Sequence, residues 1–205
     1  MSNRLAPTGP KAARSDALAN RDRILEAARD VFARRGMGAE MKEIAERAGV
    51  GVGTLYRHFE GRDALLSALL QLTKEHLLQQ LRTAVERDDP REALRAMIGA
   101  GTEVCEQFGA LTEAMLAGQL HELAGGHAEF TELFANLLQR GIREGVFRSD
   151  VDVPAVVAIV ESVFTSGTLL RFAADRSYRG AADAIADFIL VAIANGDPAA
   201  HLRPV

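Results

Sequence analysis

Met41-Lys42-Glu43-Ile44-Ala45-Glu46-Arg47-Ala48-Gly49-Val50-Gly51-Val52-Gly53-Thr54-Leu55-Tyr56-Arg57-His58-Phe59 is the stretch that decides the fold of the N-terminal part of the chain. Its apolar residues are spaced as in two short helices, which we expect at about 41–48 and 52–58. Ala45 is small enough to let the helices cross closely, and Gly49 supplies the positive φ of a tight turn. The pattern predicts a helix-turn-helix whose small core is made by Ile44, Ala48, Val50 and Leu55.

The second of these helices has polar and apolar side chains left over once its core residues are assigned. They are Val52, Gly53, Thr54, Tyr56, Arg57 and His58. A helix held in this way fits the major groove of B-DNA.

The remainder of the chain is also predicted to be helical. Trp is absent and Tyr occurs twice, and no segment shows the period-2 alternation of a strand. Capping residues, Gly and Pro divide the chain into nine expected helices, at about 16–35, 41–48, 52–58, 62–87, 90–108, 109–125, 127–144, 154–174 and 179–194. The expected fold class is therefore all-α.

The order and spacing of residues from about 20 to 66 resemble the DNA-binding domain of the TetR/AcrR family of transcriptional regulators. The matching runs are Arg23-Ile24-Leu25-Glu26-Ala27-Ala28, Val31-Phe32, Gly36, Glu43-Ile44-Ala45, Ala48-Gly49-Val50, Gly53-Thr54-Leu55-Tyr56-Arg57-His58-Phe59 and Arg62-Asp63-Ala64-Leu65-Leu66. Residues 1–15 contain Pro7, Gly9 and Pro10 with little apolar content, so we expect a disordered arm there. The resemblance implies a helix-turn-helix DNA-binding domain (16–61) and a helical ligand-binding and dimerisation domain (62–205). It also implies a repressor that a small effector releases from a palindromic operator.

The resemblance and side-chain chemistry together assign candidate DNA contacts. Val52, Gly53 and Thr54 would approach base edges, and Lys42 would reach a base edge or a phosphate. Tyr56 and His58 resemble family positions that bind phosphate, and Arg62 with the N-terminal amides of its helix would hold another. Packing remains the alternative for Tyr56 and a structural role for His58. Arg57 suits phosphate contact and a solvated position equally.

Two positions depart from the family pattern. Glu40 stands where the family often has Thr or Ser, and its carboxylate can cap helix amides but would repel phosphate. Gly51 stands where Ser is common. Both departures suggest a smaller phosphate footprint at this end of the motif.

Charge is distributed unevenly along the chain. Residues 1–65 hold 12 Lys and Arg against 9 Asp and Glu, a net charge of +3, whereas residues 66–205 have a net charge of −7. This asymmetry fits a DNA-facing head on an acidic body, although chance could also produce it.

The single Cys105 cannot form an internal disulfide, and no apolar run suits a membrane span or secretory signal. We therefore expect a cytoplasmic protein.

The last two expected helices carry more apolar residues than one subunit can bury, which favours a homodimer over a monomer with two core helices. The candidate interface residues are Val160, Phe164, Gly167, Ile185, Phe188 and Ile189. A two-fold dimer would also set two recognition helices on successive major grooves.

A pocket for a largely apolar effector is expected among the middle helices. Its candidate lining residues, each of which plain core packing would also explain, are His76, Met97, Gly101, Cys105, Phe108, Met115, Gln119, Phe134 and Phe164. No cofactor or metal is expected.

The sequence fits two other classes of protein less well. His121-Glu122 followed by His127 has the wrong spacing for a zinc-protease helix, and no phosphate loop or dinucleotide fingerprint is present, so an enzyme is not expected. A ligand-binding protein that keeps the fold but has lost DNA binding remains the second alternative, to which Glu40 lends some support.

Overall fold

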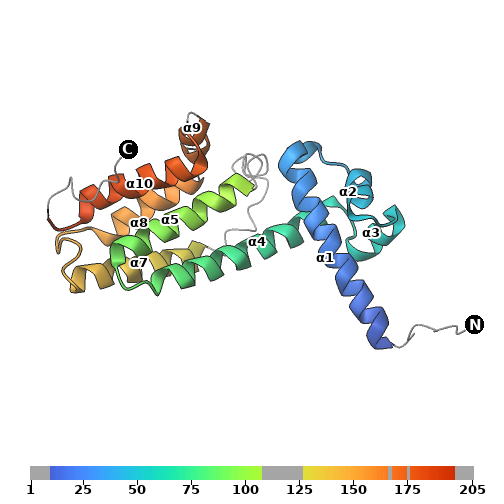
Figure 1. The fold of residues 1–205 in the computed structure, drawn as a ribbon, viewed down its shortest axis with the longest axis horizontal. Helices are drawn as coiled ribbons and strands as arrows, with labels where there is room; N and C mark the ends of the chain where they lie inside the picture. The colour runs from blue at the N-terminus through green and yellow to red at the C-terminus, as the bar shows by residue number, and fades with distance from the viewer. Residues whose placement is uncertain (1–9, 108–126, 166–167, 175, 197–205) are drawn as a thin grey trace, which may run out of the picture. The chain divides into compact units, whose positions relative to one another are not determined.

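The computed structural model describes residues 10–107, 127–165, 168–174 and 176–196, and these segments are helical as predicted. Within them the only β-type pairing is one isolated bridge, between Phe147 and Ala194. The α-helices, labelled in Figure 1, are α1 (Pro10–Arg35), α2 (Met41–Ala48), α3 (Val52–His58), α4 (Arg62–Val85), α5 (Pro90–Gln107), α7 (His127–Arg143), α8 (Val153–Thr165), α9 (Thr168–Ala174) and α10 (Tyr178–Ile193). A short 3-10 helix, η1 (Gly36–Gly38), lies between α1 and α2.

The helix-turn-helix has the predicted bounds, whereas three other predicted segments either differ from the structure or lie outside the described residues. α1 begins at Pro10 and not near Asp16, so the disorder expected for residues 1–15 is wrong for residues 10–15, and 1–9 lie outside the described residues. Proline has a preset helical φ at a first helical position, and the alanines that follow it favour helix. The helix expected at 154–174 is two helices, α8 and α9. The helix expected at 109–125 lies outside the described residues.

The chain divides into two compact units, residues 1–70 and 71–205. The boundary therefore falls inside α4, nine residues beyond the expected limit at 61. Leu65, Leu66, Leu69 and Leu70 in the first turns of α4 are buried, whereas Gln71 and Leu72 are exposed. The apolar face of α4 thus assigns its first turns to the N-terminal unit.

The first unit is built around the apolar face of α1. Ile24, Ala28, Val31 and Phe32 are completely buried. Arg47 of α2 is bound to Asp30 of α1, with its Nε 3.1 Å from Oδ2. α2 is consequently held to α1 by both apolar packing and an ion pair.

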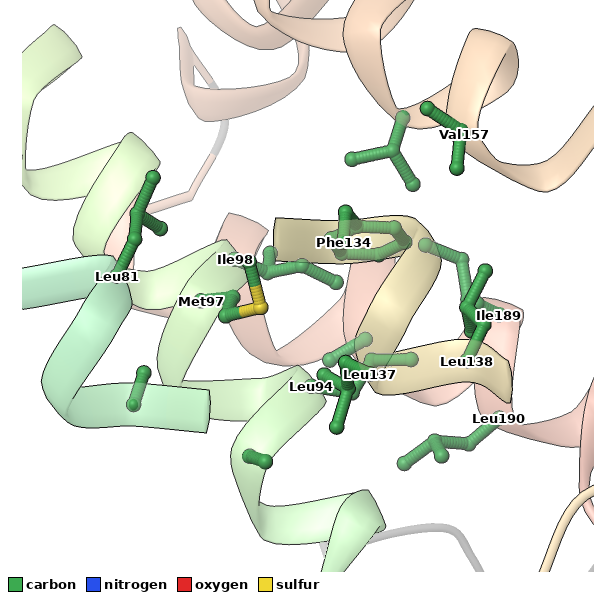
Figure 2. Close-up of a cluster of buried hydrophobic side chains, with 14 of the residues drawn as sticks. Leu81, Leu94, Met97, Ile98, Phe134, Leu137, Leu138, Val157, Ile189 and Leu190 are labelled. Carbon is green, nitrogen blue, oxygen red and sulfur yellow. The ribbon is translucent and has the colours of Figure 1, made fainter. Parts of the chain in front are cut away.

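The second unit has α5 at its centre. α5 packs against α10, α7 and α8, and Figure 2 shows the side chains that these helices and α4 contribute to one apolar cluster. Among the described helices, none is long and apolar enough to span a bilayer.

Two polar arrangements hold the ends of helices in the second unit. Arg140 of α7 donates to the carbonyl oxygens of Val85 (2.9 Å) and Arg87 (2.8 Å) at the C-terminal end of α4. Asn195 donates from Nδ2 to the carbonyl oxygens of Gly145 (2.9 Å) and Phe147 (3.1 Å). The first ties α4 to α7, and the second ties the end of α10 to the loop after α7.

Gly141 of α7 is required by the close approach of Phe147. A Cβ atom at position 141 would lie 2.2 Å from Cδ2 of the Phe147 ring. The ring is buried, and the carbonyl of Gly141 accepts from the Phe147 amide at 3.0 Å, so Phe147 cannot move away easily.

We therefore expect Gly141→Ala to lower the free energy of unfolding by about 1–3 kcal/mol, as overpacking of a core does. Gly99→Ala is the matched control, because Gly99 is also helical and a Cβ there meets nothing within 4 Å among the described residues. The control should be stabilised by about 0.5–1 kcal/mol. Urea unfolding followed by circular dichroism measures both, and equal stability of the two variants would contradict the assigned packing.

Candidate DNA interface and effector site

The turn between α2 and α3 fixes the direction of α3. Gly49 has φ +65° and ψ +35°, the left-handed conformation that glycine adopts most readily. The amide of Val50 then reaches back to the carbonyl of Ala45 at 3.0 Å, which completes the C-terminal cap of α2.

α3 consequently has an inner and an outer face. Leu55 is fully buried and faces the core, whereas Val52 is 39% and Tyr56 49% exposed. Gly53 and Arg57 are also exposed, and Thr54 and His58 are half-buried. The structure therefore brings the predicted base-contacting and phosphate-contacting residues together on one short helix.

Two arginines hold the ends of the segment that follows α3. The guanidinium of Arg21 in α1 lies 5.2 Å from the ring centroid of Phe59. That of Arg62, at the start of α4, lies 5.6 Å from the ring centroid of Phe32. Arg62 is thus half-buried where it was predicted to meet a phosphate. Arg21 was missed, although its position three and four residues before Ile24 and Leu25 places it on the core-facing side of α1.

α2 contributes Lys42, whose side chain is 75% exposed and lies 3.9 Å from Glu46 on the same helix. Glu40 occupies the N-cap position of α2, but its carboxylate does not make the cap hydrogen bond that its position allows. Its backbone supplies the cap geometry alone, with φ −104° and ψ 140°, and the exposed carboxylate is left at the edge of the motif.

Comparison with known proteins identifies the family. The model of the family described as "Bacterial regulatory proteins, tetR family" matches residues 24–69. The transcriptional repressor KstR2 of Mycobacterium tuberculosis is 31% identical over 150 residues, which cover 68% of this chain and 75% of KstR2. The chain belongs to the TetR family of transcriptional regulators. The family membership that the sequence motif predicted is thereby confirmed. An enzyme is excluded because members of this family are regulators.

Solved structures of the family have the same fold. PfmR of Thermus thermophilus is 27% identical and superposes with a TM-score of 0.66 over 82% of this chain and 97% of PfmR. FadR of Bacillus subtilis, solved in complex with stearoyl-CoA, is 17% identical with a TM-score of 0.63 over 82% of this chain and 97% of FadR, which shows the fold alone.

The predicted interface residues of this TetR-family chain separate into two groups. Val160 is fully buried and Ile189 is 5% exposed, both inside the core of the second unit, which contradicts their assignment to a dimer interface. Phe188, in contrast, is 72% exposed, and Ile159 (54%) and Val191 (38%) are exposed on the same two helices, α8 and α10. Phe164 and Ile185 are half-buried, and Gly167 lies outside the described residues.

The predicted effector residues are also divided. Met97 and Phe134 are packed into the core, whereas His76 is exposed and lines an open groove of about 410 Å³ between α4 and α5. The other residues lining this groove are mostly polar, among them Gln79, Gln80, Thr83 and Glu103. His76 therefore lies at a polar surface groove and not beside the apolar residues with which it was grouped.

Gly101, Cys105 and Phe164 do lie close together. A Cβ at Gly101 would meet Cε1 of Phe164 at 2.8 Å, so glycine lets the ring rest against α5. Cys105, 8% exposed, is in the apolar cluster against which Phe164 also packs. Phe108, Met115, Gln119, His121 and Glu122 lie outside the described residues. No group of three potential metal ligands occurs in the part of the chain that the structure describes.

Burial raises the pKa of the Cys105 thiol from 9.0 to about 11, because the apolar surroundings disfavour the thiolate. The thiolate is the nucleophile, so at pH 8 its population falls from roughly one tenth to about one thousandth.

We expect iodoacetamide to alkylate native Cys105 about a hundredfold more slowly at pH 8 than it alkylates the urea-unfolded chain. Mass spectrometry gives both rates, and the single cysteine makes the assignment unambiguous. Equal rates in the native and unfolded chains would show that Cys105 is not enclosed.

Proposed function

We propose that this chain is a repressor that binds a palindromic operator as a homodimer and is released by a small, largely apolar effector. The observation that carries the proposal is the outer face of α3, where Val52, Gly53, Tyr56 and Arg57 are exposed while Leu55 is buried. Large apolar side chains on the outside of a short helix favour a binding partner over a solvated surface. The relative KstR2 is named a repressor, which supports the same direction of control.

The contacts proposed for DNA divide by chemistry. Val52, Gly53 and Thr54 occupy the first turn of α3, the part of a recognition helix that meets base edges. Tyr56, Arg57 and His58 follow one turn later and carry the hydroxyl, guanidinium and imidazole donors that bind phosphate oxygens. Lys42 and Arg62 add positive charge at the starts of α2 and α4.

The first test is selection of duplexes from a random-sequence library, followed by binding measurements over a range of salt concentration. We expect a two-fold symmetric site and a log–log salt slope set by the number of phosphate contacts. Arg57→Ala should weaken binding to every duplex and make the slope less steep by about one per subunit, because the contact is to the backbone.

Arg143→Ala is the matched control for loss of an exposed arginine, since Arg143 lies at the end of α7 in the second unit. It should leave the salt slope unchanged. If the selection enriches no sequence, the proposed function is contradicted and a protein that retains the fold without binding DNA is favoured. The exposed carboxylate of Glu40, which would repel phosphate, supports that alternative.

A homodimer is proposed through the outer faces of α8 and α10. Phe188, Ile159 and Val191 are large apolar side chains that the subunit leaves exposed. Their burial in a two-fold interface would stabilise the pair by about 25 cal/mol for each Å² of apolar surface removed from water. Phe188, the most exposed of the three, is the natural centre of such an interface.

Phe188→Glu should therefore yield a folded monomer that binds a palindromic duplex much more weakly, because a buried unpaired charge disfavours association. Sedimentation velocity measures the assembly state and circular dichroism checks folding. Gln139→Glu, an equally acidic change at an exposed position on α7, should remain dimeric. A dimeric Phe188→Glu variant would move the proposed interface elsewhere.

The effector is proposed to act through α4, because this one helix contributes to both compact units. Its C-terminal half is bound to α7 by Arg82, which pairs with Glu129, and by Arg140 at the terminal carbonyls. A ligand that displaced α7 or α8 would consequently pull on α4. The apolar grouping of Gly101, Cys105 and Phe164 supports a largely apolar ligand. A coupling of about 1–3 kcal/mol suffices for regulation and acts equally in both directions.

A further inference from the structure

The first turn of α3 presents methyl groups and almost no hydrogen-bonding capacity. Val52 has a purely apolar side chain that is 39% exposed, Gly53 has none, and Thr54 combines one methyl with one hydroxyl. Arginine, lysine, asparagine and glutamine are all missing from this turn. The charged Arg57 is on the next turn, where the phosphate contacts are proposed.

The four bases differ in the chemical groups that they present to such a turn in the major groove. Guanine offers two acceptors that suit arginine or lysine, adenine pairs with asparagine or glutamine, and cytosine offers a donor to a carboxylate. Thymine alone offers a methyl group, at C5, which apolar side chains contact in the major groove. Val52 is therefore matched to thymine, and Thr54 can add a second methyl contact.

Gly53 gives independent support for a close approach at this turn. A Cβ atom there would meet nothing within 4 Å among the described residues, so packing within the protein does not require glycine. Glycine inside a helix is less stable than alanine. Its presence is explained if the backbone of α3 comes close to the base pairs, as contact with the short side chains of Val52 and Thr54 demands.

The nearest alternative reader is Lys42. Its ammonium group lies 3.9 Å from the carboxylate of Glu46, one turn further along α2. The neighbouring Glu43 is paired with Arg35. The Glu46 carboxylate partly offsets the charge of Lys42 and so weakens its approach to the acceptors of guanine and to phosphate alike.

We infer that each operator half-site is recognised chiefly through thymine C5-methyl groups in the major groove, contacted by Val52 and Thr54. The inference rests on the proposed function, since it specifies how the recognition helix distinguishes one sequence from another. Removal of one methyl contact should weaken binding about fourfold, the factor that corresponds to about 0.8 kcal/mol for a buried methylene-sized group.

The test uses a duplex selected from the random library, in which each thymine is replaced in turn by deoxyuridine. The replacement removes the C5-methyl group and keeps every hydrogen-bonding atom. We expect about a fourfold loss of affinity at one or two thymines in each half-site. Replacing such a T·A pair by C·G should weaken binding, and 5-methylcytosine at that position should restore part of the loss.

Val52→Ala supplies the double-mutant cycle. This variant should bind the thymine duplex more weakly and should no longer distinguish thymine from deoxyuridine at the contacted position. Arg57→Ala, on the same helix, should bind every duplex more weakly but keep the fourfold difference. Gly53→Ala should fold normally and lose affinity for all duplexes.

Unchanged affinity after every deoxyuridine replacement would overturn the inference while leaving DNA binding intact. A loss confined to guanines replaced by 7-deazaguanine, and abolished by Lys42→Ala, would assign the recognition to α2 and also overturn it. Enrichment of no duplex would remove the proposed function itself, an outcome that the selection step reveals before any base is modified.

Discussion

The left-handed conformation of Gly49 is the constraint on which the rest of the binding face depends. With φ at +65°, α2 ends there, and α3 starts in a direction that leaves Leu55 buried, as Ile44 and Ala45 of α2 are. An L-residue with a side chain would resist this conformation. Because consecutive helical residues are rotated by about 100°, the burial of Leu55 directs its neighbour Tyr56 outward. Val52, in the first turn of α3, is also 39% exposed. One backbone angle therefore selects both the core and the surface of the motif.

α4 contributes apolar side chains to both compact units of the chain. Its first turns belong to the N-terminal unit through Leu65, Leu66, Leu69 and Leu70, and Leu81 belongs to the core cluster of the second unit. The polar contacts of Arg140 at its C-terminal carbonyls satisfy groups that a helix end leaves without partners. The two ends of α4 are thus packed into the cores of two different units.

The sequence predicted those features that depend on local chemistry. Gly49 and Gly51 interrupt the pattern, so the bounds of α2 and α3 were correct. α10 shows the limit of such reasoning, because apolar residues occur around most of its circumference and periodicity could not tell which side the subunit covers. Ile189 faces the core and Phe188 faces outward, although the two are adjacent. Contacts such as Arg47 with Asp30 depend on tertiary packing between distant residues, for which the sequence carries no local signal.

The small positive charge of the N-terminal residues explains why the proposed DNA-binding face of α3 would need the proposed dimer. Residues 1–65 have a net charge of only +3, and the carboxylate of Glu40 is exposed and makes no cap hydrogen bond. Both features limit the affinity that each subunit gains from contacts with DNA phosphates. Contacts through methyl groups add little per base pair, so one recognition helix alone would bind weakly. Two such helices joined in a dimer gain affinity by acting together, but only when their spacing fits the DNA. Under the proposed function, a regulator with weak half-sites would be released by a small change in spacing, and an effector would need little binding energy to produce that change.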